Sequence, residues 1–248
     1  MKKIILFSFL AISAFSASAQ NLRDVLKKSK DSTGRVNIGK IIPGTNSAGL
    51  SAGEVVEGLK EALVVGTEKS AARLSSLDGF FKDAAIKILM PAEAQKAEKK
   101  LRTMGLGKQV DDAVLSMNRA AEDAAREVTP IFVNAIRQMT FEDAMGILRG
   151  GDFAATDYLK RKTTSQLTEA FRPVIENSLQ KVNATKYWNT VFTTYNRFST
   201  EKVNTDLVAY VTEKALAGIF YQVGLEEQKI RKDPFARTSD ILKKVFAN

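Results

Sequence analysis

Apolar residues recur every three or four positions over most of the chain after residue 50, which is the spacing of one buried face of an α-helix. Ser51 and Glu54 form a capping-box pattern, and the apolar residues after them predict a first long helix that ends near Leu74. The period is lost over residues 75–91. This segment is either a loop with a short extended piece or a short helix, because periodicity alone does not separate the two.

Two or three helices are predicted in the next fifty residues. Pro91 suits the first position of a helix that ends in the Gly105–Gly107 region. A regular apolar stripe then covers residues 108–128. The Thr129-Pro130 pair interrupts this stripe, so we expect a kink there, or a new helix that runs to about Met139.

The second half of the chain carries further start and stop signals of helices. These are Thr140 with Asp143, the pair Gly150-Gly151, Asp152 as the cap of a helix through Lys162, and Thr163 with Gln166. The helix that opens at Thr163 is expected to continue past Pro173 with a kink. Asp206 is expected to cap a last long helix that ends near Lys232, and Thr238 a short terminal helix through Phe246.

Strand signals are almost absent, so the pattern predicts an all-α fold. We expect residues 51–248 to form a single-domain bundle of about eight to ten helices, several of them kinked or broken at Pro or Gly. Residues 20–50 are rich in Lys, Ser, Asn and Gly and are expected to be a flexible leader. The sequence therefore predicts one helical domain behind a leader.

Residues 1–19 have the pattern of a signal peptide. Lys2 and Lys3 precede an apolar run, and Ala17-Ser18-Ala19 supplies the small residues that a signal peptidase reads. The apolar run is too short for an ordinary spanning helix, and no Cys follows it to accept a lipid. We therefore expect a soluble periplasmic protein that is cleaved after Ala19 and has no transmembrane segment in its mature form.

The composition excludes several kinds of chemistry. The chain has no Cys and no His, so it has no Ser-His-Asp triad, Cys-His nucleophile, HExxH zinc site or thiol redox centre. We expect no cofactor and no bound metal. The formal net charge of +9 favours anionic partners, which outside the cytoplasm are lipid headgroups and acidic glycans rather than nucleic acid.

Two pairs of polar residues interrupt the apolar stripes. Gln222 and Glu226 project onto the stripe of the last long helix, where a carboxylate needs a basic partner; alternatively, Gly224 shifts the helix phase and Glu226 is solvated. Asn118 and Glu122 lie one turn apart at the edge of an earlier stripe. Either the two side chains line a pocket, or Glu122 forms an i,i+4 ion pair with Arg126.

Aromatic residues gather on one face of another predicted helix. Trp188, Phe192 and Tyr195 follow helical spacing. Such a face could hold a ligand or a lipid, but aromatic residues at this spacing ordinarily pack in a core, and we interpret them as core.

Short motifs in a fixed order resemble an exported bacterial family, domain of unknown function 4197. They are Gly58-Leu59-Lys60-Glu61-Ala62-Leu63, Asp78-Gly79-Phe80, Met117-Asn118-Arg119-Ala120-Ala121-Glu122, Asp143-Ala144 with Ile147-Leu148, Ala154-Ala155-Thr156-x-Tyr158-Leu159, Asp206-Leu207 with Tyr210-Val211-Thr212, Glu226-Glu227-x-x-Ile230-Arg231-x-x-Pro234, and Arg237-Thr238. The resemblance covers about residues 50–247 and implies a signal-bearing, mostly helical domain of Gram-negative bacteria. It brings no catalytic residue. Ala217 departs from the pattern, which has an acidic or polar residue there.

These observations favour a periplasmic helical binding or structural protein without catalysis. One alternative is a hydrolase or lyase that uses a carboxylate pair, and another is a basic surface protein that contacts anionic lipid or envelope glycan. The partner is expected to be an unknown small ligand or envelope component. The residues expected to matter for binding are Asn118, Glu122, Tyr158, Glu226, Arg231 and Arg237.

Overall fold

The computed structural model describes residues 52–198, 200, 202–203 and 205–233. The expected signal peptide, the leader, Pro234 and the expected helix at Thr238 lie outside the described residues. The chain divides into two compact units, residues 1–58 with 238–248 and residues 59–237. The described part of the first unit is the beginning of one helix, and everything else described below belongs to the second unit.

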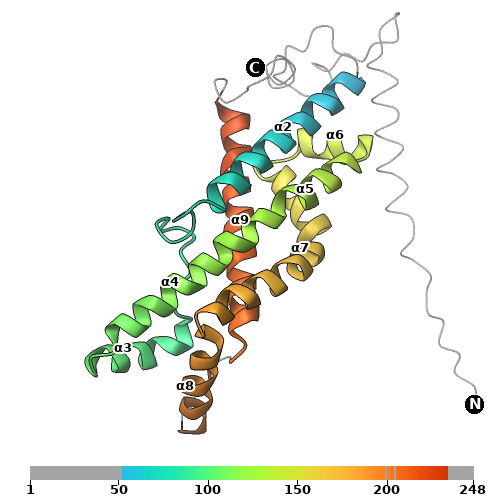
Figure 1. Ribbon diagram of the computed structural model, residues 1–248. Helices are drawn as coiled ribbons and strands as arrows, with labels where there is room; N and C mark the ends of the chain where they lie inside the picture. The colour runs from blue at the N-terminus through green and yellow to red at the C-terminus, as the bar shows by residue number, and fades with distance from the viewer. Residues whose placement is uncertain (1–51, 199, 201, 204, 234–248) are drawn as a thin grey trace, which may run out of the picture. The chain divides into compact units, whose positions relative to one another are not determined.

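The described residues form eight α-helices and no strand, which confirms the all-α fold (Figure 1). The helices are α2 (Ala52–Leu74), α3 (Gln95–Thr103), α4 (Gly107–Ala124), α5 (Val128–Arg137), α6 (Phe141–Arg149), α7 (Ala154–Lys181), α8 (Ala184–Phe198) and α9 (Leu207–Lys232). Two short 3-10 helices, Ala92–Ala94 and Ala125–Glu127, precede α3 and α5. No helix in the described part of the chain is both long enough and apolar enough to cross a membrane.

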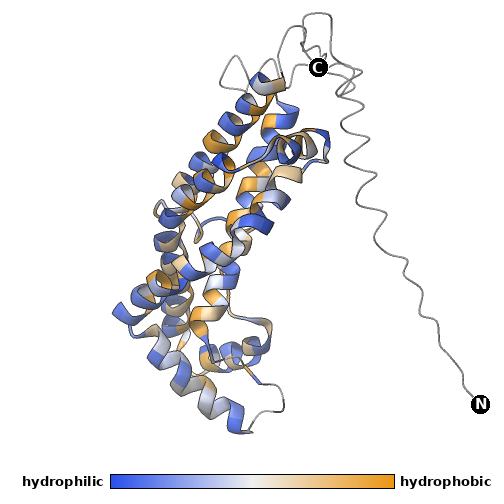
Figure 2. Ribbon diagram, turned by 90° about the vertical axis from the view of Figure 1, so that its right-hand side faces the viewer, coloured by the Kyte–Doolittle hydropathy of each residue, from blue (hydrophilic) through white to orange (hydrophobic). Residues whose placement is uncertain are grey.

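Helix α7 is the centre of the second unit, because it packs against α4, α5 and α9. Figure 2 shows that the long helices carry hydrophobic and hydrophilic residues in alternation along their length, as amphipathic helices do. Their apolar sides meet in a core that contains large side chains with almost no exposed surface, among them Phe80, Phe132, Phe171, Leu59 and Met117. Burial of this apolar surface is the main favourable contribution to folding.

Several predicted helix ends are confirmed. Helix α2 ends at Leu74, and α9 ends at Lys232. Thr140 and Asp143 form a complete capping box at the start of α6, since each side chain accepts a hydrogen bond from the other residue's backbone amide. Asp206 caps α9 through the Ala209 amide. Each of these signals acts within one helical turn.

The predicted break at Thr163 is wrong, because α7 runs without interruption from Ala154 to Lys181. The Thr163 hydroxyl donates to the Leu159 carbonyl oxygen at 2.6 Å. This bond lies within the helix, so Thr163 does not cap the start of a new helix. The Thr163 side chain is also fully buried. Pro173 lies inside the continuous helix, as expected.

Two further helix boundaries differ from the sequence analysis. Asp152 does not cap α7; Phe153 holds the cap position and makes no side-chain cap bond. The break before α5 falls at the 3-10 turn Ala125–Glu127, ahead of Pro130. Pro130 lies in the first turn of α5, where its missing N–H has no partner inside the helix and costs nothing.

Residues 75–91 form neither helix nor strand before the 3-10 turn at Ala92, so the loop alternative is confirmed for this segment. We call residues 75–91 the α2–α3 loop. Most of its backbone hydrogen bonds are short turns, such as Gly79 N–H to Ser76 O and Lys87 N–H to Asp83 O. The rest of its support comes from side chains of α4, which shape the site described next.

Candidate ligand-binding groove

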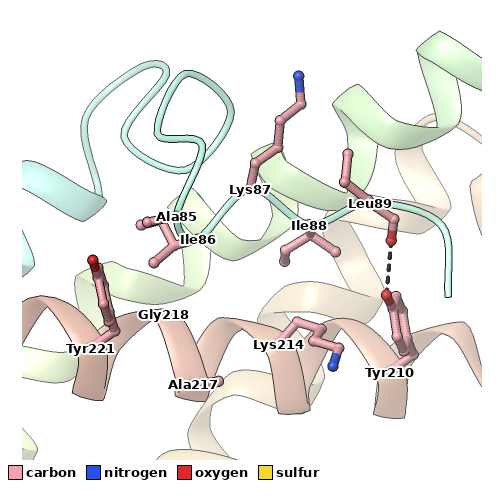
Figure 3. A pocket seen from close by; sticks show the side chains of 10 residues that line it. All are labelled: Ala85, Ile86, Lys87, Ile88, Leu89, Tyr210, Lys214, Ala217, Gly218 and Tyr221. Atoms are coloured by element: carbon pink, nitrogen blue, oxygen red, sulfur yellow. Dashed lines mark hydrogen bonds between the residues drawn. The ribbon is translucent and has the colours of Figure 1, made fainter. Parts of the chain in front are cut away.

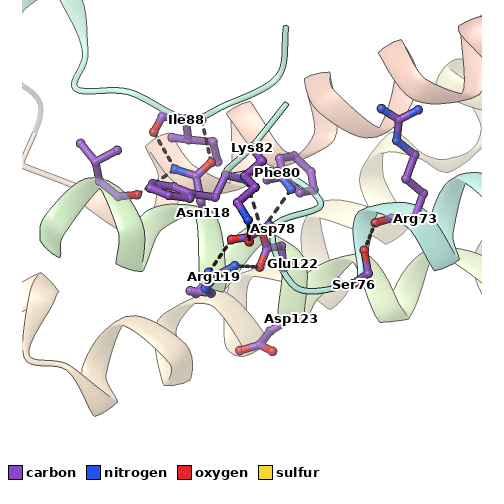
Figure 4. Close-up of polar contacts among 12 residues, drawn as sticks. Arg73, Ser76, Asp78, Phe80, Lys82, Ile88, Asn118, Arg119, Glu122 and Asp123 are labelled. Carbon is purple, nitrogen blue, oxygen red and sulfur yellow. Dashed lines mark hydrogen bonds and ion pairs between the residues drawn. The ribbon is translucent and has the colours of Figure 1, made fainter. Parts of the chain in front are cut away.

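Asn118 of α4 holds the α2–α3 loop at Ile88 (Figure 4). The Ile88 N–H donates to Asn118 Oδ1 at 2.9 Å, and Asn118 Nδ2 donates to the Ile88 carbonyl oxygen at 2.8 Å. Because one amide side chain binds both groups, the N–H and the carbonyl of Ile88 point to the same side, as they do in an extended strand. Asn118 has no exposed surface, so this pair of bonds lies in a dry environment and is costly to break.

Glu122, one turn later on α4, holds the same loop at Phe80. Its Oε1 atom accepts from the Phe80 and Phe81 amides at 3.1 and 3.2 Å, and its Oε2 atom accepts from Arg119 at 2.6 Å. Arg119 also bonds Asp78 at 2.7 Å. Hydrogen bonds from the Lys82 and Arg119 side chains hold the pKa of Asp78 below its usual value. Asn118, Arg119 and Glu122 therefore act together, and we call them the loop clamp.

The clamp gives a physical reason for the Met117-Asn118-Arg119-Ala120-Ala121-Glu122 motif. The alternative pairing of Glu122 with Arg126 is wrong, because Arg126 lies 3.6 Å from Asp123 instead. Asn118 and Glu122 do not line the groove described below. Their hydrogen bonds position the loop that does.

The clamp also brings Phe80 against α9. Phe80 is fully buried, and a Cβ atom on Gly218 of α9 would lie only 2.5 Å from its ring. Gly218 is thus the residue that allows close contact between the loop and the α9 backbone. At the start of the loop, Gly79 is similarly close to the end of α2, since a Cβ there would lie 2.4 Å from the Arg73 carbonyl oxygen.

The loop and α9 enclose an open groove of about 440 Å³ (Figure 3). Its ten lining residues are Ala85, Ile86, Lys87, Ile88 and Leu89 from the loop, and Tyr210, Lys214, Ala217, Gly218 and Tyr221 from α9. The volume falls in the range of about 300–1,000 Å³ that small-molecule sites occupy. Two of its large apolar side chains stay in contact with solvent, Leu89 at 57% and Tyr221 at 46% exposure.

A hydrogen bond closes one end of the groove. The Tyr210 hydroxyl donates to the Leu89 carbonyl oxygen at 2.8 Å. Burial, together with the charges of Glu93 and Glu213, raises the pKa of Tyr210 to about 12. The hydroxyl therefore stays protonated at neutral pH and keeps this bond.

The charges of the groove are positive. The ten lining residues, all in the described part of the chain, include two Lys and neither Asp nor Glu. Figure 3 shows the Lys214 side chain lying along α9 toward Tyr210, while Lys87 points away from α9. The Lys87 amino group lies 3.9 Å from the centre of the Phe81 ring, which is a cation–π contact. Lys214 is thus the cation inside the groove.

Glu226, expected to be buried against a basic partner, is only partly buried and forms no ion pair with a described residue. That expectation is wrong, because the carboxylate buried against a basic partner is that of the neighbouring Glu227. Glu227 is 6% exposed, and Arg231 Nη2 donates to its Oε1 atom at 2.8 Å. Helix α9 is continuous through Gly224, and Glu227 follows the buried Val223 by one turn. Gln222 is buried, as expected.

Glu227 has a second role as the cap of a distant helix. Its carboxylate accepts from the Ala155 and Thr156 amides at 2.9 and 2.8 Å, and from the Thr156 hydroxyl at 2.8 Å. The two amides belong to the first turn of α7, where N–H groups lack partners inside the helix. Arg231 also donates to the Ile147 carbonyl oxygen at 2.9 Å, which ties α6 to α9.

The remaining candidate residues are not in the groove. Tyr158 is buried within α7, and its hydroxyl donates to the Ala135 carbonyl oxygen at 3.4 Å. Burial raises the pKa of Tyr158. Arg237 lies outside the described residues. Trp188 and Phe192 are buried with ring centres 4.4 Å apart, which confirms them as core.

Sequence reasoning missed the groove residues of α9. Tyr210, Lys214, Ala217 and Tyr221 follow one another at i, i+4, i+7 and i+11, so they share one helix face. That face lies away from the buried stripe, and two tyrosines on it were the signal that could have found the site. No three acidic side chains among the described residues come together as a metal site would require.

The fold and the groove define an all-helical protein with an open, ligand-sized groove between a clamped loop and its last long helix. The family model described as protein of unknown function, DUF4197, matches residues 49–247, and the chain belongs to this family. No curated protein and no solved structure matches the chain.

Proposed function

We propose that this protein is a non-catalytic helical binding protein that takes a small apolar molecule in the groove between residues 85–89 and α9. The observation that supports this proposal is the groove itself. It has a ligand-sized volume, aliphatic and aromatic walls, and the exposed apolar side chains of Leu89 and Tyr221. Solvent-exposed apolar surface in a concave site is typical of ligand-binding clefts.

The two buried carboxylates favour a binding role over the hydrolase or lyase alternative. Glu122 and Glu227 each use both oxygens to accept hydrogen bonds from backbone amides or from Arg and Thr side chains. They belong to separate places in the fold and hold a loop and a helix end, respectively. All four carboxylate oxygens already accept hydrogen bonds from the protein, and neither residue lines the groove.

The site of action in this proposal is the periplasm. The support is the pattern of residues 1–19, with two lysines, an apolar run and Ala17-Ser18-Ala19. The ligand would then be an apolar component of the envelope or of the surrounding medium.

A neutral probe tests the proposal. The full mature chain is titrated with N-phenyl-1-naphthylamine, an uncharged dye that fluoresces in apolar sites. We expect saturable binding that Ala217→Trp abolishes, because a large ring on this exposed groove residue fills the space of the ligand. Ala72→Trp, a change on an exposed face of α2, is the matched control and should bind the dye as the wild type does. Equal binding by both variants would overturn the proposal.

A further inference from the structure

We infer that the ligand of the groove carries an anionic head, a carboxylate or phosphate, on an apolar chain; this inference rests on the proposed function. The head lies at the Tyr210 end beside Lys214 and the Leu89 amide, and the chain lies toward Tyr221. The groove is divided in this way because its cation, Lys214, lies at the Tyr210 end, whereas aliphatic side chains and the Tyr221 ring line the other end (Figure 3).

The Leu89 amide is the first donor for the head. Ile88 directs its N–H and its carbonyl to Asn118 on α4, so its extended neighbour Leu89 directs both groups to the opposite side. The Leu89 carbonyl does reach the Tyr210 hydroxyl on α9. Met90 precedes Pro91, which also favours extended backbone at this point. The Leu89 N–H therefore points to the α9 side, and no described residue accepts its hydrogen bond.

Lys214 is the second donor. Its Nζ atom lies 5.6 Å from the centre of the Tyr210 ring, so its charge is at the same end of the groove as the Leu89 amide. Glu213 lies 3.8 Å from Lys214, but the two side chains are 76% and 45% exposed, respectively. An ion pair this exposed is weak in water and leaves the ammonium group available to an anion.

Among the lining residues, no cation points into the opposite end of the groove. Ile86, Ala217 and Gly218 supply aliphatic surface, and the Tyr221 ring stands beside them (Figure 3). A cationic head at the Tyr210 end would lie beside Lys214, which repels it, although Glu93 and Glu213 also act at this end. A neutral head would leave Lys214 without a charged partner from the ligand. An anionic head is the one that satisfies both donors.

Four ligands with the same ten-carbon chain test the inference. Decanoate, decyl phosphate, 1-decanol and decyltrimethylammonium compete with the neutral dye for the wild-type protein, below the concentrations at which they form micelles. We expect the better anion to bind about tenfold more tightly than decanol, the strength of one charge-assisted hydrogen bond in a partly exposed site. Decyltrimethylammonium should bind more weakly than decanol. Preference for decanoate assigns the head to a carboxylate, and preference for decyl phosphate assigns it to a phosphate.

Lys214→Gln should remove the preference for the anion and leave the affinity for decanol and for the dye unchanged. Lys229→Gln, an exposed lysine of the same helix outside the groove, is the matched control and should keep the tenfold preference. If all four ligands bind equally to the wild type, or if the preference survives in Lys214→Gln, the inference is overturned while dye binding still supports the proposed function. Failure of the dye itself to bind would overturn both.

Discussion

At the scale of single residues, Glu227 joins two parts of the second unit through one carboxylate. It accepts from the first turn of α7 and pairs with Arg231, whose side chain is only 15% exposed. Its sequence neighbour Glu226 makes no such bonds among the described residues. Because the two adjacent glutamates have such different surroundings, the same substitution at each position measures what the Glu227 bonds contribute to stability.

Glu227→Ala should lower the free energy of unfolding by about 3–5 kcal/mol, because it leaves the Arg231 charge and the α7 amides without their partner. Glu226→Ala should lower it by about 0.5 kcal/mol or less, as changes at partly solvated positions do. Urea unfolding of the two variants measures both values. Equal midpoints would show that the Glu227 bonds contribute nothing beyond those of a solvated carboxylate.

Tyr210 gives a prediction for alkaline pH. Its pKa is raised from 10.0 to about 12, so the unfolded chain loses this proton first as the pH rises. The stabilisation from the neutral Tyr210 side chain is complete below about pH 10 and is lost as the pH rises toward about 12. Tyr210→Phe has no proton to lose. The stability advantage of wild type over Tyr210→Phe should therefore shrink between about pH 10 and about pH 12 in urea titrations. A constant difference would contradict the environment of Tyr210 described above.

At the scale of elements, the α2–α3 loop has a fixed conformation without being a helix or a strand. The loop clamp bonds the backbone of Phe80, Phe81 and Ile88 from buried side chains of α4. Protection of a backbone amide depends on how rarely its hydrogen bond opens, whatever the secondary structure around it. The loop should therefore contain protected and unprotected amides side by side.

Amide exchange followed by NMR should show slow exchange at Ile88 and fast exchange at its neighbour Leu89. The Ile88 amide is bonded to the fully buried Asn118, and the Leu89 amide has no acceptor among the described residues. Asn118→Ala should make Ile88 exchange at least about tenfold faster, since it removes that acceptor. Thr164→Ala, on an exposed face of α7, is the control and should leave both amides unchanged. Fast exchange at Ile88 in the wild type would contradict the clamp.

At the scale of the whole molecule, the prediction concerns processing of the first residues. We expect the exported protein to begin at Gln20, because Ala17-Ser18-Ala19 matches the residues that a signal peptidase reads. Intact-mass measurement of protein released from the periplasm by osmotic shock checks this. Ala19→Arg should leave a larger, unprocessed form, whereas a chain that keeps Met1 in the wild type would contradict the prediction.

Local patterns in the chain were enough to predict the fold class and most helix ends. Helix periodicity and caps depend on residues within about four positions of each other, which is why Thr140, Asp206 and the ends of α2 and α9 were predicted correctly. Periodicity correctly indicated that polar residues interrupt the apolar stripe of α9. It did not show that Glu227 rather than Glu226 is the buried carboxylate, because neighbouring helix positions differ by only about 100° around the axis. Local rules also misplaced the cap of α7.

Contacts between groups far apart in the chain could not be predicted in this way. Glu227 caps α7 from 72 positions away, Glu122 holds Phe80 from 42 positions away, and Asn118 holds Ile88 from 30 positions away. The groove has the same origin. The face of α9 with Tyr210, Lys214 and Tyr221 is visible in the sequence, but its use as a groove wall depends on where the α2–α3 loop lies. That position follows from packing and hydrogen bonds between segments far apart in the chain, which no local pattern encodes.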